Sequence, residues 1–190
     1  MKTFESADRF YRTRSKFLSL VLRHKPEAAG VTLDSEGWVD VDKLLAGVAQ
    51  AGRGLTRDEL RTLVEKNDKQ RFSFSPDGKR IRANQGHSLE VDLRLVAQTP
   101  PGELFHGTLA GNLPSIEKTG LEKRSRQHVH LSETVATAHM VATRRTGHGL
   151  VLRIDAAAMA ANNHVFYRSA NGVWLTDRVP REYISLFVAP

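Results

Sequence analysis

RFSFSPDGKRIR, the stretch from Arg71 to Arg82, carries the clearest structural signal in the sequence. Alternating residues flank Ser75–Gly78, whose proline and glycine supply the backbone angles that a tight turn needs. We therefore predict a β-hairpin with strands at Arg71–Phe74 and Lys79–Arg82.

Three arginines lie on this predicted ribbon: Arg71, Arg80 and Arg82. Alternate residues of a strand share a face, so their guanidinium groups could line up along a phosphate backbone. A hairpin whose arginines are simply solvated is the alternative.

Helical patterns precede the hairpin. Apolar residues at helical spacing predict a helix over Ser15–Arg23, which Lys25-Pro26 ends because the residue before proline disfavours the α region. Asp42–Ala49 is typical of a short helix, and a capping box at Thr56–Glu59 opens another helix that runs through Glu65. Helices followed by a basic hairpin indicate a winged-helix lobe.

Paired prolines in Gln98–Gly102 interrupt both helix and sheet, so we place a boundary there, with lobes at residues 1–98 and 99–190. In the second lobe, short predicted strands are separated by helices, as in a mixed α/β domain. We therefore assign the whole chain to the α+β class. Its predicted strands are Leu104–His106, Val129–Leu131, Gly149–Ile154, His164–Tyr167, Val173–Leu175 and Ile184–Val188, and its predicted helices are Leu113–Thr119 and Glu133–Arg145. Gly120 is the expected cap after the first of these helices, and Ser132 the expected N-cap of the second.

Composition narrows the class of function. The 190 residues include 28 Lys and Arg against 21 Asp and Glu, a formal charge of +7, which suits a polyanionic partner, although many basic proteins bind no nucleic acid. The absence of cysteine excludes disulfides, thiolate metal sites and thiol nucleophiles. A polar N-terminus and the lack of long apolar runs predict a cytoplasmic protein with no membrane segment.

Two short motifs place chemistry-bearing side chains together. Arg23-His24 follows the first predicted helix, putting a fixed cation beside a titratable ring, although cations at this position also simply complement the helix dipole. His106-Gly107-Thr108 follows a short strand, where glycine allows a ligand to approach the backbone closely.

A third motif holds two histidines. Because His128 and His130 are two apart in a strand they share a face, which is one feature of metal sites. Arg126 shares that face and would repel a cation, so an anion site fits better and we predict no metal. The chain also has no P-loop and no GxGxxG segment, so any NAD would be held differently from the way a Rossmann fold holds it.

Taken together and in order, six segments resemble the RNA 2'-phosphotransferase family over nearly the whole chain. These segments are Ser15–His24, Glu36–Val39, Asn67–Phe72, Ile81–Ser88, the His106 turn and Arg126–Ser132. The resemblance implies an N-terminal winged-helix lobe for RNA and a C-terminal lobe of the ADP-ribosyltransferase fold. Phe105 and Ser125 depart from the residues that are common in the family.

The resemblance also implies site residues. The family's catalytic tetrad carries over onto Arg23, His24, Arg71 and Arg126. The NAD site would be formed by His106, Gly107, Thr108, His130 and Ser132. Apart from the resemblance, we expect contacts to RNA from Arg80 and Arg82 of the basic hairpin and from His87.

The reaction implied is removal of an internal 2'-phosphate from RNA, such as one left by tRNA splicing, with NAD as co-substrate. An RNA-2'-phospho-ADP-ribose intermediate would form first, and the products would be nicotinamide, ADP-ribose 1'',2''-cyclic phosphate and dephosphorylated RNA. The phosphate needs no general base because its second pKa is about 6. The three arginines would neutralise its charge, and His24 would protonate the leaving 2'-oxygen.

Three alternatives remain open. The same pocket would serve an NAD-dependent ADP-ribosyltransferase that caps terminal phosphates of nucleic acids. A non-enzymatic winged-helix binder of nucleic acid would explain the first lobe and the charge, and a metal-dependent phosphatase is a further possibility. We assume a monomer.

Overall fold

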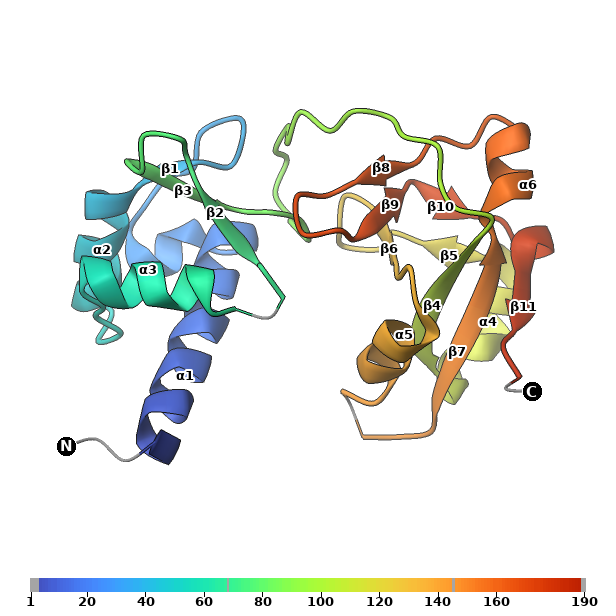
Figure 1. Ribbon diagram of the computed structural model, residues 1–190, viewed down its shortest axis with the longest axis horizontal. Helices are drawn as coiled ribbons and strands as arrows, with labels where there is room; N and C mark the ends of the chain where they lie inside the picture. The colour runs from blue at the N-terminus through green and yellow to red at the C-terminus, as the bar shows by residue number, and fades with distance from the viewer. Residues whose placement is uncertain (1–3, 68, 145, 189–190) are drawn as a thin grey trace. The chain divides into compact units, whose positions relative to one another are not determined.

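The computed structural model describes residues 4–67, 69–144 and 146–188. The chain folds into two compact units, Met1–Arg94 and Leu95–Pro190 (Figure 1). Each unit combines helices with small antiparallel sheets, so the chain is of mixed α/β class. The boundary predicted from the paired prolines lies a few residues beyond the one between these units.

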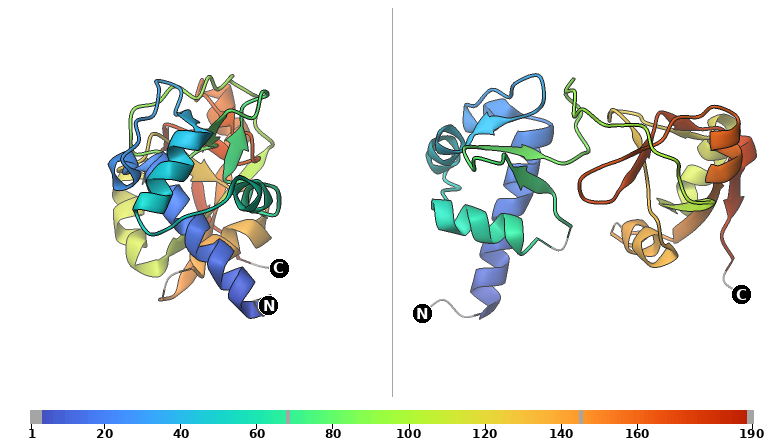
Figure 2. Two further views of the ribbon diagram at one scale, coloured as in Figure 1. Left: turned by 90° about the vertical axis from the view of Figure 1, so that its left-hand side faces the viewer. Right: turned by 45° about the horizontal axis from the view of Figure 1, so that its top comes forward.

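The first unit begins with the long helix α1, Phe4–Arg23. This helix starts earlier than the predicted Ser15, because Phe10 and Tyr11 also pack against the apolar core and extend the helical stripe toward the N-terminus. It ends at Arg23 as predicted, and Pro26 opens the short 3-10 helix η1, Pro26–Ala29. The N-terminal end of α1 projects from the rest of the unit in every view (Figure 2).

Two further helices have caps that explain where they begin. The side chain of Asp40 accepts a hydrogen bond from the backbone of Lys43 and so caps α2, Val41–Gln50. Thr56 and Glu59 form both halves of the predicted capping box before α3, Arg57–Glu65.

The predicted hairpin is confirmed by strands β2, Phe72–Phe74, and β3, Arg80–Ala83. They pair in antiparallel register, and β1, Val39–Asp40, adds to the other edge of β3. The core lies between this sheet and the helices, and its fully buried members include Leu18, Val21, Leu22, Val41, Leu44, Leu60 and Ile81.

The second unit is built from three small sheets. The strands β4 (Glu103–Leu109), β7 (Gly149–Asp155) and β11 (Ile184–Leu186) form one sheet; β6 (Val129–Leu131), β9 (Trp174–Thr176) and β8 (Tyr167–Arg168) form the second; β5 (Leu121–Glu122) and β10 (Arg178–Val179) form the third. Two backbone hydrogen bonds between Phe105 and Ser132, of 2.8 and 2.7 Å, connect β4 with the residue that follows β6. These bonds bring the predicted His106 turn and the predicted His130 strand together.

The helices of this unit are α4 (Leu113–Thr119), α5 (Val135–Ala142) and α6 (Ala156–Ala161), with 3-10 turns η2 (Ala110–Asn112) and η3 (Arg181–Tyr183). Gly120 caps α4 at a φ of 76°, as predicted. The N-cap predicted at Ser132 is wrong: Thr134 caps α5, because the backbone of Ser132 is bonded to Phe105 in extended conformation. The predicted end of this helix, Arg145, lies outside the described residues.

In the part of the chain that the structure describes, no helix combines the length and the apolar character that crossing a membrane requires.

Candidate functional site

Arg23 and His24 stand where α1 ends and are held by the loop that follows β3. The hydroxyl of Ser88 lies 2.9 Å from Nδ1 of His24, and the backbone amide of Ser88 donates to the carbonyl of Arg23 over 3.0 Å. The second bond satisfies one of the carbonyls that a helix end leaves without an intrahelical partner. The loop therefore fixes both the helix end and the imidazole ring.

Gly86 lets this loop lie against Arg23. Its φ is +88°, a conformation that side chains rarely adopt, and a Cβ there would meet the Arg23 guanidinium at 3.6 Å. The glycine of the Gln85-Gly86-His87 segment is thus required by the backbone angle.

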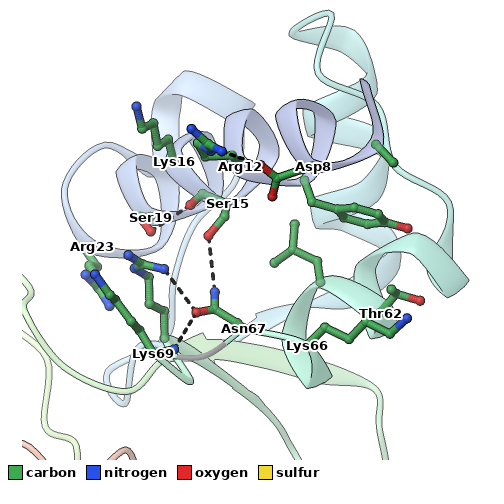
Figure 3. Close-up of a pocket in the computed structure, with 14 residues that line it drawn as sticks. Asp8, Arg12, Ser15, Lys16, Ser19, Arg23, Thr62, Lys66, Asn67 and Lys69 are labelled. Carbon is green, nitrogen blue, oxygen red and sulfur yellow. Dashed lines mark hydrogen bonds and ion pairs between the residues drawn. The ribbon is translucent and has the colours of Figure 1, made fainter. Parts of the chain in front are cut away.

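Arg71 is positioned by Asn67. The Oδ1 atom of Asn67 accepts from Nη1 of Arg71 over 3.1 Å and from the amide of Lys69 over 3.0 Å, while its Nδ2 donates to Ser15 on α1 over 3.3 Å (Figure 3). Arg23 and Arg71 line one cavity of about 740 Å³ in the first unit. The structure therefore brings these two predicted catalytic residues to the same cavity, with His24 next to Arg23 in the chain.

The fourth predicted catalytic residue, Arg126, lies in the second unit beside His130. Nη1 of Arg126 is 3.4 Å from Nδ1 of His130. A guanidinium can only donate, so Nδ1 of His130 accepts in this contact. Arg126 is exposed and precedes β6.

His106 has its ring held by the neighbouring strand. Its Nδ1 lies 3.0 Å from the carbonyl of His130. A carbonyl can only accept, so Nδ1 of His106 carries the proton and donates. Burial lowers the pKa of His106. The charge of Arg126 lowers it further, and the hydrogen bond to His130 opposes the shift without cancelling it, so the ring is neutral at physiological pH.

Gly107 and Thr108 complete the predicted turn on β4. A Cβ on Gly107 would lie 2.0 Å from the carbonyl oxygen of Ala138, so its hydrogen side chain lets α5 pack directly on the strand. The buried Thr108 hydroxyl accepts a hydrogen bond of 3.1 Å from Asn112.

A second cavity, of about 710 Å³, is lined by four of the five predicted NAD-site residues, His106, Gly107, Thr108 and His130, and by Arg126. Ser132, the fifth, does not line this cavity; its backbone is bonded to that of Phe105. Lys123, Arg124 and Arg144 bring further positive charge to the cavity. Among the described residues, four cationic side chains and three histidines line the cavity against one carboxylate, that of Glu122, so it can bind an extended anionic ligand.

Comparison with known proteins shows the family of the chain. A family model described as "RNA 2'-phosphotransferase, Tpt1 / KptA family" matches residues 11–178. This chain belongs to the RNA 2'-phosphotransferase family. The matched stretch contains every predicted site residue.

Similar chains are named probable RNA 2'-phosphotransferases. One from Hahella chejuensis is 50% identical over 179 residues, which cover 94% of this chain and 96% of the relative. One from Nostoc punctiforme is 53% identical over 90% of this chain and 93% of the relative. One from Fusobacterium nucleatum is 47% identical over 89% of this chain and 94% of the relative.

In this member of the RNA 2'-phosphotransferase family, the predicted RNA-contacting arginines are engaged within the first unit. Arg80 pairs with Asp34 over 3.3 Å, and its guanidinium lies 5.4 Å from the Trp38 ring. Arg82 lies 4.3 Å from the same ring and donates to the carbonyl of Glu36. Burial lowers the pKa of Arg82. Contact of either arginine with RNA stays a prediction.

His87, the third predicted RNA contact, is only 1% exposed. Burial and the neighbouring charges of Arg23, His24 and Arg82 lower its pKa to about 4. The ring therefore lies inside the unit as a neutral group, next to the helix end that presents Arg23 and His24.

Sequence reasoning missed the residues that hold the site in place. Asn67 and Ser88 lie in two of the six segments that resemble the family, but no role was predicted for either side chain. No role was predicted for Asn112. The basic run Lys123–Arg126, in which three of four residues are cationic, was a signal for the cationic lining of the second cavity. Among the described residues, no group of three histidine or carboxylate side chains could hold a metal ion, and the expectation that no metal takes part stays a prediction.

Proposed function

We propose that this chain is an NAD-dependent RNA 2'-phosphotransferase that removes an internal 2'-phosphate from RNA. The first unit would be a winged-helix lobe that binds RNA, and the second a lobe of the ADP-ribosyltransferase fold that binds NAD. Family membership supports the phosphate-removing activity.

The observation that carries the NAD assignment is the second cavity. Its volume of about 710 Å³ lies within the range of roughly 300 to 1,000 Å³ that is usual for small-molecule sites. The cationic side chains that line it suit the diphosphate of a dinucleotide, because guanidinium and ammonium groups are the donors that phosphate oxygens prefer. The neutral His106, with Nδ1 fixed as a donor, presents an oriented ring to the same space.

NAD would supply a ribose carbon whose bond to nicotinamide breaks readily. In the first step an oxygen of the RNA 2'-phosphate attacks that carbon and nicotinamide leaves, which forms RNA-2'-phospho-ADP-ribose. No side chain has to remove a proton from the attacking group, since a phosphate monoester is largely dianionic above its second pKa of about 6. Arg23 and Arg71 orient and neutralise this phosphate, and we assign the same task to Arg126.

In the second step the neighbouring ribose hydroxyl attacks the phosphorus, and the RNA 2'-oxygen leaves. The products are ADP-ribose 1'',2''-cyclic phosphate and RNA with a free 2'-hydroxyl. The leaving oxygen needs a proton, for which His24 is the positioned donor. Because Ser88 is bonded to Nδ1 of His24, we assign the proton transfer to Nε2.

Product analysis separates this proposal from its alternatives. A short 2'-phosphorylated RNA is incubated with the protein and NAD, and all products are identified by mass spectrometry. We expect dephosphorylated RNA and cyclic phosphate. A stable ADP-ribosylated RNA end would support the capping transferase instead, and binding without NAD turnover would support the non-enzymatic binder.

A further inference from the structure

The cavity lined by Arg23 and Arg71 is a groove between α1 and α3. Arg12, Lys16, Ser19 and Arg23 line it from α1 at spacings of four, three and four residues, so they share one face of the helix. Lys66 lines the opposite wall, at the end of α3 (Figure 3). We refer to this cavity, between α1 and Thr62–Arg71, as the α1–α3 groove.

The groove is strongly cationic. Among the residues that the structure describes, six lysines and arginines line it against one carboxylate, that of Asp8, which is paired with Arg12. Lys16 and Lys66 are exposed, and neither forms an ion pair with any residue that the structure describes. Their charges are therefore available to an anionic ligand without the loss of an internal contact.

The arginines of the β2–β3 hairpin, Arg80 and Arg82, differ from Lys16 and Lys66 because they already have partners within the first unit. The charge of Arg80 is partly balanced by its ion pair with Asp34, and Arg82 donates to the Glu36 carbonyl, while both guanidinium groups lie over the Trp38 ring. A ligand that extends from Arg23 and Arg71 meets accessible charge along the α1–α3 groove.

We propose that the α1–α3 groove binds single-stranded RNA next to the 2'-phosphate, with Lys16 and Lys66 contacting its backbone phosphates. This proposal rests on the proposed function and names the path of its substrate. From Lys16 to Arg23 the helix rises about 10 Å, at about 1.5 Å per residue. The cationic side chains of the groove therefore extend along a path long enough for a short stretch of an RNA strand.

A single strand fits the groove better than a duplex. The walls rise on both sides of a cavity of about 740 Å³, and the ring of Tyr11 lines it. Single-strand sites combine such a basic groove with aromatic rings on which bases stack. Duplex RNA is instead read across the wide, shallow minor groove, over many base pairs.

Substrate length provides the first test. Turnover is measured on a 2'-phosphorylated dinucleotide and on twelve-residue RNAs extended in either direction, for wild type and for the variant Lys16→Glu with Lys66→Glu. We expect the charge reversals to raise KM at least tenfold more for one of the long RNAs than for the dinucleotide. Lys43→Glu, a single exposed charge reversal on α2, is the control and should leave every KM unchanged. Equal effects at all lengths in the double variant would overturn the proposal.

Binding provides the second test, independent of turnover. Fluorescence anisotropy at low salt follows a labelled, unphosphorylated RNA of twelve residues. We expect the double variant to bind at least tenfold more weakly than wild type and Lys43→Glu. If wild type turns over NAD and RNA but the double variant binds this RNA normally, the groove is excluded while the proposed function stands.

If wild type has no turnover but the double variant loses binding, the proposed function fails and the groove remains. A blunt duplex of the same sequence, offered as competitor, should displace the strand poorly. Equal competition would contradict the single-strand assignment.

Discussion

The hydroxyl of Ser88 lies 2.9 Å from Nδ1 of His24, and the amide of the same serine donates to the carbonyl of Arg23. One residue of the loop after β3 thus fixes two neighbours at the end of α1. The bond to Nδ1 orients the ring and leaves the exchange of a proton to Nε2, so Ser88 is a positioning residue for the proposed acid.

Ser88→Ala should lower the rate of the second step by about tenfold, because a loosely held acid spends less time in reach of the leaving oxygen. Ser88→Thr keeps a hydroxyl and should restore most of the rate. Single-turnover rates on a 2'-phosphorylated RNA, with the pH profile of the second step, provide the measurement. Equal rates in Ser88→Ala and wild type across the profile would remove Ser88 from the mechanism.

His24→Ala should slow the second step far more than the first, by about 10²- to 10⁴-fold, the usual contribution of a positioned acid. Nicotinamide leaves as a neutral molecule and needs no proton, whereas the RNA 2'-oxygen does. Rapid-quench analysis should therefore show RNA-2'-phospho-ADP-ribose accumulating. If His24 only complements the helix dipole, the variant will lose about 0.3 to 1 kcal/mol of stability with an unchanged ratio of intermediate to product.

Gly107→Ala should destabilise the second unit by about 1 to 3 kcal/mol, the usual cost of forcing extra volume into a packed site. Its Cβ would approach the Ala138 carbonyl to 2.0 Å and the Ala142 amide to 2.7 Å, both of them backbone atoms of α5. A Cβ on Gly111 would meet no atom within 4 Å, so Gly111→Ala serves as the control. Urea unfolding followed by Trp174 fluorescence in a Trp38→Phe background checks this, and equal midpoints for the two variants would contradict close packing of α5 on β4.

The motifs with a local physical cause were predicted well from the sequence. The Pro76–Gly78 turn, the Thr56 capping box and the Gly120 cap depend on neighbouring residues and are all present. The Ser132 cap failed because a partner far away in the chain, Phe105, binds its backbone. The start of α1 was placed too late, since only the fold shows that Phe10 and Tyr11 reach the core.

The same limit applies to the candidate site. Arg23, His24 and Arg71 were named from the sequence, and the structure brings Arg23 and Arg71 to one cavity. The roles of Asn67 and Ser88 depend on hydrogen bonds that span 52 and 64 residues of sequence, to Ser15 and His24, and no spacing rule indicates such contacts.

The buried His87 should make the first unit less stable in acid. Its folded pKa of about 4 lies below the ordinary value of 6.5, so the unfolded chain takes up the proton first as the pH falls. Stability should fall from pH 6.5 toward pH 4 by up to about 1.4 kcal/mol per pH unit, and should be unaffected by this group above that window. Urea unfolding at pH 7.5 and pH 5, followed by Trp38 fluorescence in a Trp174→Phe background, measures the slope. His87→Asn should flatten the slope, and an equal slope in this variant would contradict the assignment.

NAD dependence is tested most directly by counting products from a 2'-phosphorylated RNA in the presence of EDTA. With NAD, we predict one nicotinamide and one ADP-ribose cyclic phosphate for each RNA dephosphorylated, and without NAD we predict no dephosphorylated RNA and no inorganic phosphate. Release of inorganic phosphate without NAD, or loss of activity in EDTA that added metal restores, would contradict phosphate transfer to NAD and support a metal-dependent phosphatase.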